Sequence, residues 1–209
     1  MATVKPEENL KLESGWLCLD FANTAEWHLS EHPTERLTSY AELIAWARSI
    51  NLLPDRAAQQ LLRAADQHPT EAARVLDRVV ALREAIYRLF VAVATGTSPA
   101  ADDQATLNAE LSRSLSKSRL VWNKASFGWG RQGEDGDLDQ VLWWILRSTT
   151  NLLTSEDIQR VGICADDRGC GWLFYDTSRN RTRQWCSMGG CGNRAKAKRH
   201  YEKGRAETL

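Results

Sequence analysis

Residues 160–205 read RVGICADDRGCGWLFYDTSRNRTRQWCSMGGCGNRAKAKRHYEKGR. This stretch holds four of the five cysteines, as two close pairs with fifteen residues between them: Cys164, Cys170, Cys186 and Cys191. Each pair can bind one side of a tetrahedral ion, and four thiolates at about 2.3 Å complete the coordination shell of zinc without an open position for water. The spacing therefore predicts one structural Zn²⁺ held by these four cysteines.

Neither redox chemistry nor core packing suits these cysteines as well as a metal does. The intervals inside the pairs are five and four residues, not the two-residue interval of thiol oxidoreductases. The surrounding loops are rich in Gly, Asp and Arg, which is atypical of cysteines that fill a hydrophobic core. The fifth cysteine, Cys18, lies in the apolar stretch WLCLDFANT and is expected to be a small buried hydrophobic residue.

The residues around the pairs predict a small treble-clef-like α+β zinc finger. Residues 171–176 resemble a strand, residues 177–180 a turn, and a second strand would lead to Trp185. After Cys191, the sequence GNRAKAKRHYEKGR favours a helix that ends at Gly204. The first N–H groups of this helix would point at the thiolate of Cys191. Because so small a segment buries little surface, we expect zinc to contribute much of its folding free energy.

The rest of the chain predicts a helical body, so the expected fold class is mainly α. Ser39 and Glu42 have capping-box spacing. Apolar residues recur at the helical period in five segments: residues 39–53, 54–67, 69–96, 101–117 and 138–153. The expected division is a helical domain of residues 1–158, which would bind a ligand, followed by the finger at residues 159–209.

Some parts of the body are less regular. Residues 1–14 are polar and suggest a loose arm, and residues 16–24 are ambiguous between helix and strand. Two apolar stretches, residues 120–122 and 127–129, suggest a hairpin. His28 and His32 have the spacing of a helical metal pair, but Pro33 follows and no third ligand is evident, so we expect a surface turn. Asn23 and Thr24 either line a ligand pocket or cap a helix.

Charge divides the chain in the same way as cysteine. Residues 1–158 carry 16 Lys and Arg against 22 Asp and Glu, whereas residues 159–209 carry 11 against 5. This asymmetry indicates that the finger meets a polyanion. No apolar run approaches the roughly 20 residues that span a bilayer, and the charged N-terminus is unlike a signal peptide. We therefore expect a cytoplasmic protein with no membrane partner.

The cations of the finger gather on its expected helix. Lys196, Arg199 and Lys203 recur at spacings of three and four and share one face, flanked by Arg194 and Lys198. This face suits the DNA backbone, and Arg194, near the helix start, is the candidate for reading guanine. Three arginines before the helix would grip adjoining phosphates: Arg179, Arg181 and Arg183. The alternatives are a solvated cationic helix, or arginines that only offset the negative charge of a zinc tetrathiolate.

The finger also resembles a known family. Cys191-Gly192-Asn193-Arg194, within FYDTSRNRTRQWCSMGGCGNR, is similar to the tetrapeptide that gives the CGNR zinc fingers their name. In such proteins the finger commonly follows an ABATE-type domain, and LCLDFANT near the start resembles the opening of that domain. The resemblance implies a bacterial, stress-induced transcription regulator that binds DNA. Its helical body would sense a small-molecule effector or a partner.

Three further functions stay open. The finger could instead be an adaptor that docks an acidic protein. It could bind RNA or single strands if Trp172 and Trp185 stack on bases, although we expect these rings to form the finger's core. An enzyme in the body is disfavoured, since no Ser-His-Asp set, phosphate loop or paired-carboxylate motif stands out. A homodimer would suit a palindromic DNA site.

Overall fold

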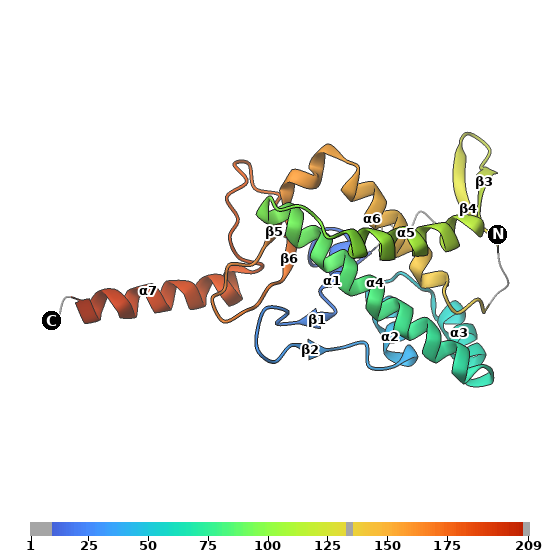
Figure 1. The fold of residues 1–209 in the computed structure, drawn as a ribbon, viewed down its shortest axis with the longest axis horizontal. Helices are drawn as coiled ribbons and strands as arrows, with labels where there is room; N and C mark the ends of the chain where they lie inside the picture. Colours follow the sequence, from blue (N-terminus) through green and yellow to red (C-terminus); the bar gives the residue numbers. More distant parts are fainter. Residues whose placement is uncertain (1–9, 133–135, 207–209) are drawn as a thin grey trace.

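The computed structural model describes residues 10–132 and 136–206, with side chains as far as Glu202. A helical body occupies most of the length, and one helix, α7, extends away from it (Figure 1). The fold class is mainly α, as predicted. The helices are α1 Leu17–Ala22, α2 Tyr40–Ser49, α3 Asp55–Gln67, α4 Pro69–Thr95, α5 Ala101–Ser116, α6 Gln140–Leu153 and α7 Asn193–Ala206, with a 3₁₀ turn at Glu156–Arg160 (η2) and a π turn at Met188–Gly192 (η3).

Three two-stranded antiparallel ladders accompany the helices, and none joins another among the described residues. β1 (Ala25–Glu26) pairs with β2 (Thr34–Glu35). The predicted hairpin forms as β3 (Ser118–Trp122) with β4 (Phe127–Arg131). In the finger, β5 (Val161–Ile163) pairs with β6 (Leu173–Tyr175). Within the described part of the chain, no helix is both long and apolar enough to cross a membrane.

Local signals in the sequence place the helix ends. The side chain of Ser39 accepts a hydrogen bond from the backbone N–H of Glu42, as its capping-box spacing predicts. Pro69 occupies the first turn of α4, where its missing N–H costs nothing. α4 ends at Thr95 and is capped by Gly96, whose φ of 68° is a left-handed conformation that glycine adopts without strain. Helices α2 to α6 therefore lie close to the predicted segments.

The ambiguous residues 16–24 form the central helix, α1. Every residue of α1 is buried, because the helix packs against both α4 and α6. A helix covered on all sides shows no amphipathic period, which explains the missing signal in the sequence. Cys18 is fully buried there, as expected, and burial raises the pKa of its thiol to about 12.

The arm and the histidine pair differ from expectation. Residues 1–9 of the expected arm lie outside the described residues, but Leu10 and Leu12 pack on the core and the Lys11 N–H donates to the carbonyl of Ile50. His32 is exposed, as a surface turn requires. The surface turn is wrong for His28, whose ring stacks on Tyr87 at 3.6 Å and whose side chain is only 8% exposed.

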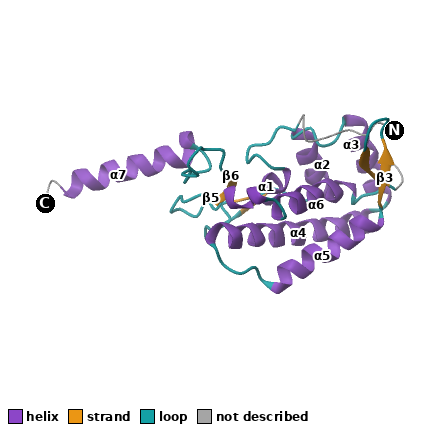
Figure 2. Cartoon of the chain, turned by 90° about the horizontal axis from the view of Figure 1, so that it is seen from above, coloured by secondary structure: helices purple, strands orange, loops and turns teal. Residues whose placement is uncertain are grey.

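The hydrophobic core continues from the body into the finger. Val161 of β5 and Leu173 of β6 belong to the same buried cluster as the body helices. The amide of Asn23 donates to the carbonyl of Leu173 at 2.8 Å and accepts from its N–H at 2.9 Å. Asn23 therefore acts as an extra rung beside β6, and this contact replaces the capping role considered for it. The first half of the finger packs on the body, whereas α7 extends away from it (Figure 2).

Candidate metal centre

The four predicted cysteines meet at one point. Their sulfur atoms all lie within 4.8 Å of one another. The Sγ atoms of Cys170 and Cys186 are 3.8 Å apart, and those of Cys186 and Cys191 are 3.6 Å apart. Four ligands at about 2.3 Å from a tetrahedral ion lie about 3.8 Å from one another, so the cluster has the dimensions of a zinc tetrathiolate.

The first cysteine pair is shaped by backbone close to the body. Cys164 follows β5 directly, and two glycines with positive φ, Gly169 and Gly171, flank Cys170. A side chain on Gly169 would meet the backbone of Leu29 and Ser30 at about 2.5 Å, so only glycine fits this approach. The Leu29 N–H donates to the carbonyl of Gly169 at 3.1 Å. Residues 164–171, which we call the knuckle, therefore pack on the loop between β1 and β2.

The second pair is placed by the π turn that precedes α7. The side chain of Ser187 accepts from the Gly190 N–H, and its carbonyl accepts from the Gly192 N–H. These contacts close the turn and place Cys191 beside the other three sulfurs. The expectation that N–H groups at the helix start point at the Cys191 thiolate is wrong, because the N–H groups of Gly190, Gly192 and Asn193 bond to oxygen atoms within the turn. Besides Cys186, the guanidinium of Arg194 contacts the Cys191 sulfur, at 2.9 Å.

The thiols ionise unequally without a cation between them. Hydrogen bonds from Cys170 and Cys186, with backbone N–H groups of Cys186 and Asp166, lower the pKa of Cys164 to about 2. Hydrogen bonding to Cys164 and Cys170 raises the pKa of Cys186, and burial raises the pKa of Cys191 to about 12. A bound divalent cation removes this difference in pKa between the thiols, because it favours the thiolate form at all four positions.

Arg194 connects the metal centre to a buried carboxylate. Its Nε and a terminal nitrogen lie 3.1 and 3.0 Å from Oδ2 of Asp166, whose side chain is 3% exposed. Burial opposes ionisation of Asp166, but bonds from Arg168 and Arg194 bring its pKa well below the usual range. Both guanidinium groups also lie over the ring of Trp27, at 5.1 and 5.7 Å. Arg194 therefore ties α7 to the knuckle and to the body.

The predicted second strand of the finger is wrong. Among the described residues 176–187 no strand forms, and β6 pairs instead with β5. Asp176 closes the loop by accepting from the N–H groups of Ser178 and Arg183. The guanidinium of Arg183 donates to the carbonyls of Tyr175, Trp185 and Cys186. Side chains thus satisfy the backbone groups that a second strand would have paired.

The cations of α7 fall into two sets. Arg194 pairs with Asp166, and Lys198 forms an ion pair with Asp167, so this face of the helix points at the knuckle. Lys196 is exposed and has no ion pair within the described part of the chain. Arg199 lies over the ring of Trp185 at 5.8 Å. The side chain of Lys203 lies outside the described residues, and the helix runs past the expected end at Gly204 to Ala206.

The remaining expected contact residues precede α7. Arg179 and Arg181 are exposed in the loop after β6, and Arg181 has a φ of 51°. Trp172 and Trp185 pack against the cysteine cluster, as expected for core residues of the finger. A third ring, Trp27, joins them from the body. The sequence gives no local signal for Trp27, because its contact with the cysteines spans well over a hundred residues.

A closed tetrathiolate between a docked knuckle and the start of a cationic helix defines a structural zinc finger. The model of the CGNR zinc finger matches residues 160–204. The model of ABATE, described as "Putative stress-induced transcription regulator", matches residues 15–156. The chain belongs to the ABATE family and carries a CGNR zinc finger, whose four cysteines hold one structural zinc ion. No curated protein matches the sequence.

Proposed function

We propose that this chain is a transcription regulator that binds duplex DNA through α7. The observation that carries the proposal is the exposure of this helix: every residue from Lys196 to Glu202 is exposed. A helix that is polar on all sides is stabilised by a partner or by many internal ion pairs. α7 has an excess of cations and projects clear of the body (Figures 1 and 2), so a polyanion is the partner that its charge favours.

The ion pairs indicate which face of α7 meets DNA. Arg194 and Lys198 are neutralised by Asp166 and Asp167 of the knuckle. Lys196 and Arg199 lie away from these acids, and the helical period places Lys203 with them. We assign phosphate contacts to this outer face, with Arg179 and Arg181 beside it. In this assignment Arg183 and Arg194 position the finger from inside, and guanine readout by Arg194 becomes the less favoured role.

The body supplies a groove for an effector. An open groove of about 560 Å³ runs between the start of the chain and the finger, and it is lined by Asp20, Asn23, Thr24, Arg36, Trp46 and Trp172 among others. Because Trp172 also packs on the cysteine cluster, a ligand in this groove would contact both halves of the protein. The mixture of charged and aromatic side chains suits a small polar molecule with a flat apolar part. The reducing bacterial cytoplasm, where thiols persist, is the compartment we propose.

The test is the salt dependence of DNA binding by the full-length, zinc-loaded protein. Each phosphate contact adds about 0.9 to the slope of log K against log salt. Substitution of Lys196→Ala with Arg199→Ala is expected to weaken binding of duplex DNA about 10-fold or more at low salt and to reduce the slope by about 2. Zinc content should stay at one ion per chain.

A matched control removes two cations of the body. Arg56→Ala with Arg63→Ala makes the same change in net charge on exposed positions of α3, which lies far from α7 (Figure 1). This variant should bind DNA like the parent protein. Equal loss in both variants would reduce the effect to overall charge, and binding that ignores salt would refute the phosphate contacts. Capture of an acidic protein with no affinity for DNA would favour the adaptor role instead.

A further inference from the structure

The β3–β4 hairpin presents four large apolar side chains on a single face. In its register Leu120 lies opposite Trp129, and Trp122 lies opposite Phe127. Residues two apart in a strand point to the same side, so these four share one face. Their exposed fractions run from 45% to 68%, and the rings of Trp122 and Phe127 meet edge to face at 5.0 Å. The patch is contiguous and open to solvent.

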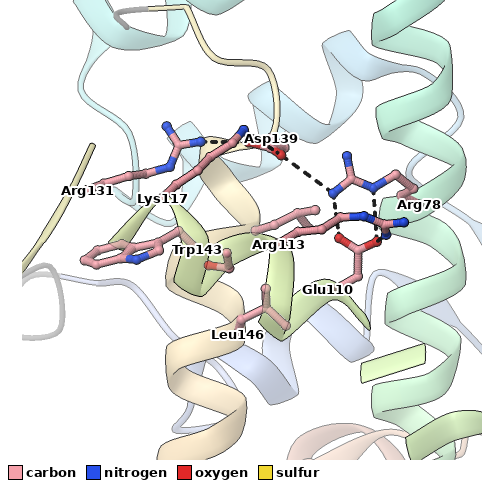
Figure 3. A pocket seen from close by; sticks show the side chains of 10 residues that line it. Arg78, Glu110, Arg113, Lys117, Arg131, Asp139, Trp143 and Leu146 are labelled. Atoms are coloured by element: carbon pink, nitrogen blue, oxygen red, sulfur yellow. Dashed lines mark hydrogen bonds and ion pairs between the residues drawn. The ribbon is translucent and has the colours of Figure 1, made fainter. Parts of the chain in front are cut away.

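Ion pairs anchor the hairpin at its base. Lys117 and Arg131 both bind Asp137 and Asp139, with nitrogen–oxygen distances of 2.6 to 3.1 Å. Figure 3 shows this network continuing through Asp139 to Arg78 and Glu110 on the body helices. The indole N–H of Trp143 donates to the side chain of Ser118 at 2.8 Å. The strands that carry the apolar face are therefore anchored to the body helices at their base.

The size of this face suits an interface between two copies. Side chains of this kind bury on the order of 150–250 Å² each when covered, so at their exposed fractions the four residues offer roughly 450 Å². The largest apolar patch on a typical monomer covers about 300–600 Å² and is often a functional surface, so a patch of this size is a candidate contact surface. Doubled across a symmetric contact this gives about 900 Å², which lies below the roughly 1,200 Å² of stable complexes and in the range of weak, reversible contacts. Trp and Phe are also typical anchors of such contacts.

The charge pattern selects the kind of partner. Arg119 and Val121 lie on the opposite face, where their side chains cover Gly130, and Lys124 lies in the turn with a φ of 60°. The apolar face itself carries no charge, so an anionic surface gains nothing from it. Among the described residues eight large apolar side chains are exposed, and the other four are scattered over separate segments: Leu29, Leu115, Met188 and Tyr201.

Among the described residues, the apolar patch that matches the hairpin in size is therefore the same hairpin on a second copy of the chain. We propose that two chains associate through their β3–β4 hairpins, with the apolar faces packed together about a twofold axis. A twofold contact uses the same patch on both partners, as this patch allows. The hairpin lies at the end of the molecule opposite α7 (Figures 1 and 2), so the contact leaves both cationic helices open. The inference does not depend on DNA binding.

The test is sedimentation equilibrium of the full-length, zinc-loaded protein across the micromolar range without DNA. The parent chain is expected to show a reversible monomer–dimer equilibrium. Trp122→Ser with Phe127→Ser should weaken association about 100-fold or more, because exposed aromatic anchors dominate such contacts. Both rings are exposed in the single chain, so helix content and zinc stoichiometry should stay unchanged. Phe127→Ser alone should give an intermediate loss.

The control changes the same hairpin away from its apolar face. Arg119→Gln with Lys124→Asn should leave the dimer intact. A parent protein that stays monomeric at the highest concentration overturns the proposal, and so does a dimer that survives loss of both rings. Vesicles of phosphatidylcholine and phosphatidylserine provide a further arm. A monomer that floats with these vesicles, and is released by the Trp122 and Phe127 changes, would assign the apolar face to a bilayer and refute the dimer.

Discussion

The two ends of this molecule offer opposite chemistry. α7 is exposed from Lys196 to Glu202 and carries cations on its outer face, whereas the β3–β4 hairpin exposes large uncharged side chains on one face. Each is held at its base by ionic contacts: α7 by a zinc tetrathiolate and Asp166, the hairpin by Asp137 and Asp139. The partner of a projecting element therefore follows from its side chains, while its direction follows from its anchor.

Removal of zinc should separate the two ends most sharply. Replacement of Cys186 by Ser, or chelation of the metal, is expected to lower DNA affinity at least 100-fold, since the finger owes much of its order to the ion. Hydrogen exchange should accelerate in η3 and α7 and not in the hairpin. Cys18→Ala, which removes a thiol buried in the body, serves as the control and should retain the metal. Equal protection of α7 with and without zinc would contradict the anchoring role.

Loss of the rung beside β6 should have the next largest effect. Asn23→Ala leaves the buried N–H and carbonyl of Leu173 without their partner, and each unsatisfied group costs about 1–3 kcal/mol. The free energy of unfolding should fall by roughly 2–5 kcal/mol. Asn23→Asp keeps one acceptor and should show a different, partial loss. Chemical denaturation measures both, and a change below about 0.5 kcal/mol would show that the rung is dispensable.

Substitution of Arg194 should weaken the metal centre without emptying it. Arg194→Ala removes the cation beside the Cys191 sulfur and the partner of Asp166. Loss of a group that contacts a metal ligand typically lowers metal affinity 10- to 100-fold, so we expect about 10-fold here. Competition with a chromogenic chelator provides the measurement. Lys196→Ala, on the outer face, should leave zinc affinity unchanged. If Arg194→Ala affects only DNA affinity, the arginine belongs to the DNA-binding face.

The smallest expected effect is on the pH dependence of stability and concerns Glu84, in the body. Hydrogen bonding to His28, and ion pairing with Arg83 against the opposing effect of burial, lower the pKa of Glu84 to about 2 from its ordinary value of 4.5. A carboxyl whose pKa is lowered on folding stabilises the fold above about pH 4.5 and loses this contribution as pH falls towards 2. Between pH 4.5 and pH 2, the melting temperature of Glu84→Gln should therefore fall less than that of the parent protein. An unchanged slope would show that Glu84 contributes nothing there.

Features with a local signature were predictable from the sequence. The four cysteines, the Ser39 cap and the helical period of α4 depend on residues close in the chain. Contacts between distant residues were not predictable. Asn23 reaches Leu173 across 150 positions, and Trp27 meets the cysteines from the body. The second strand was misplaced because composition alone does not show that β5, outside the cysteine pairs, is the partner of β6.

The docking of the knuckle on Leu29 has a consequence for the geometry of any larger assembly. Because Gly169 touches the backbone of the body and Val161 lies in the shared core, the finger has no free tether. α7, about 21 Å long at 1.5 Å per residue, therefore leaves the body in a direction that the docked knuckle sets. In a pair of chains the distance between the two α7 helices is set by the bodies, so the spacing of paired DNA sites would report that distance.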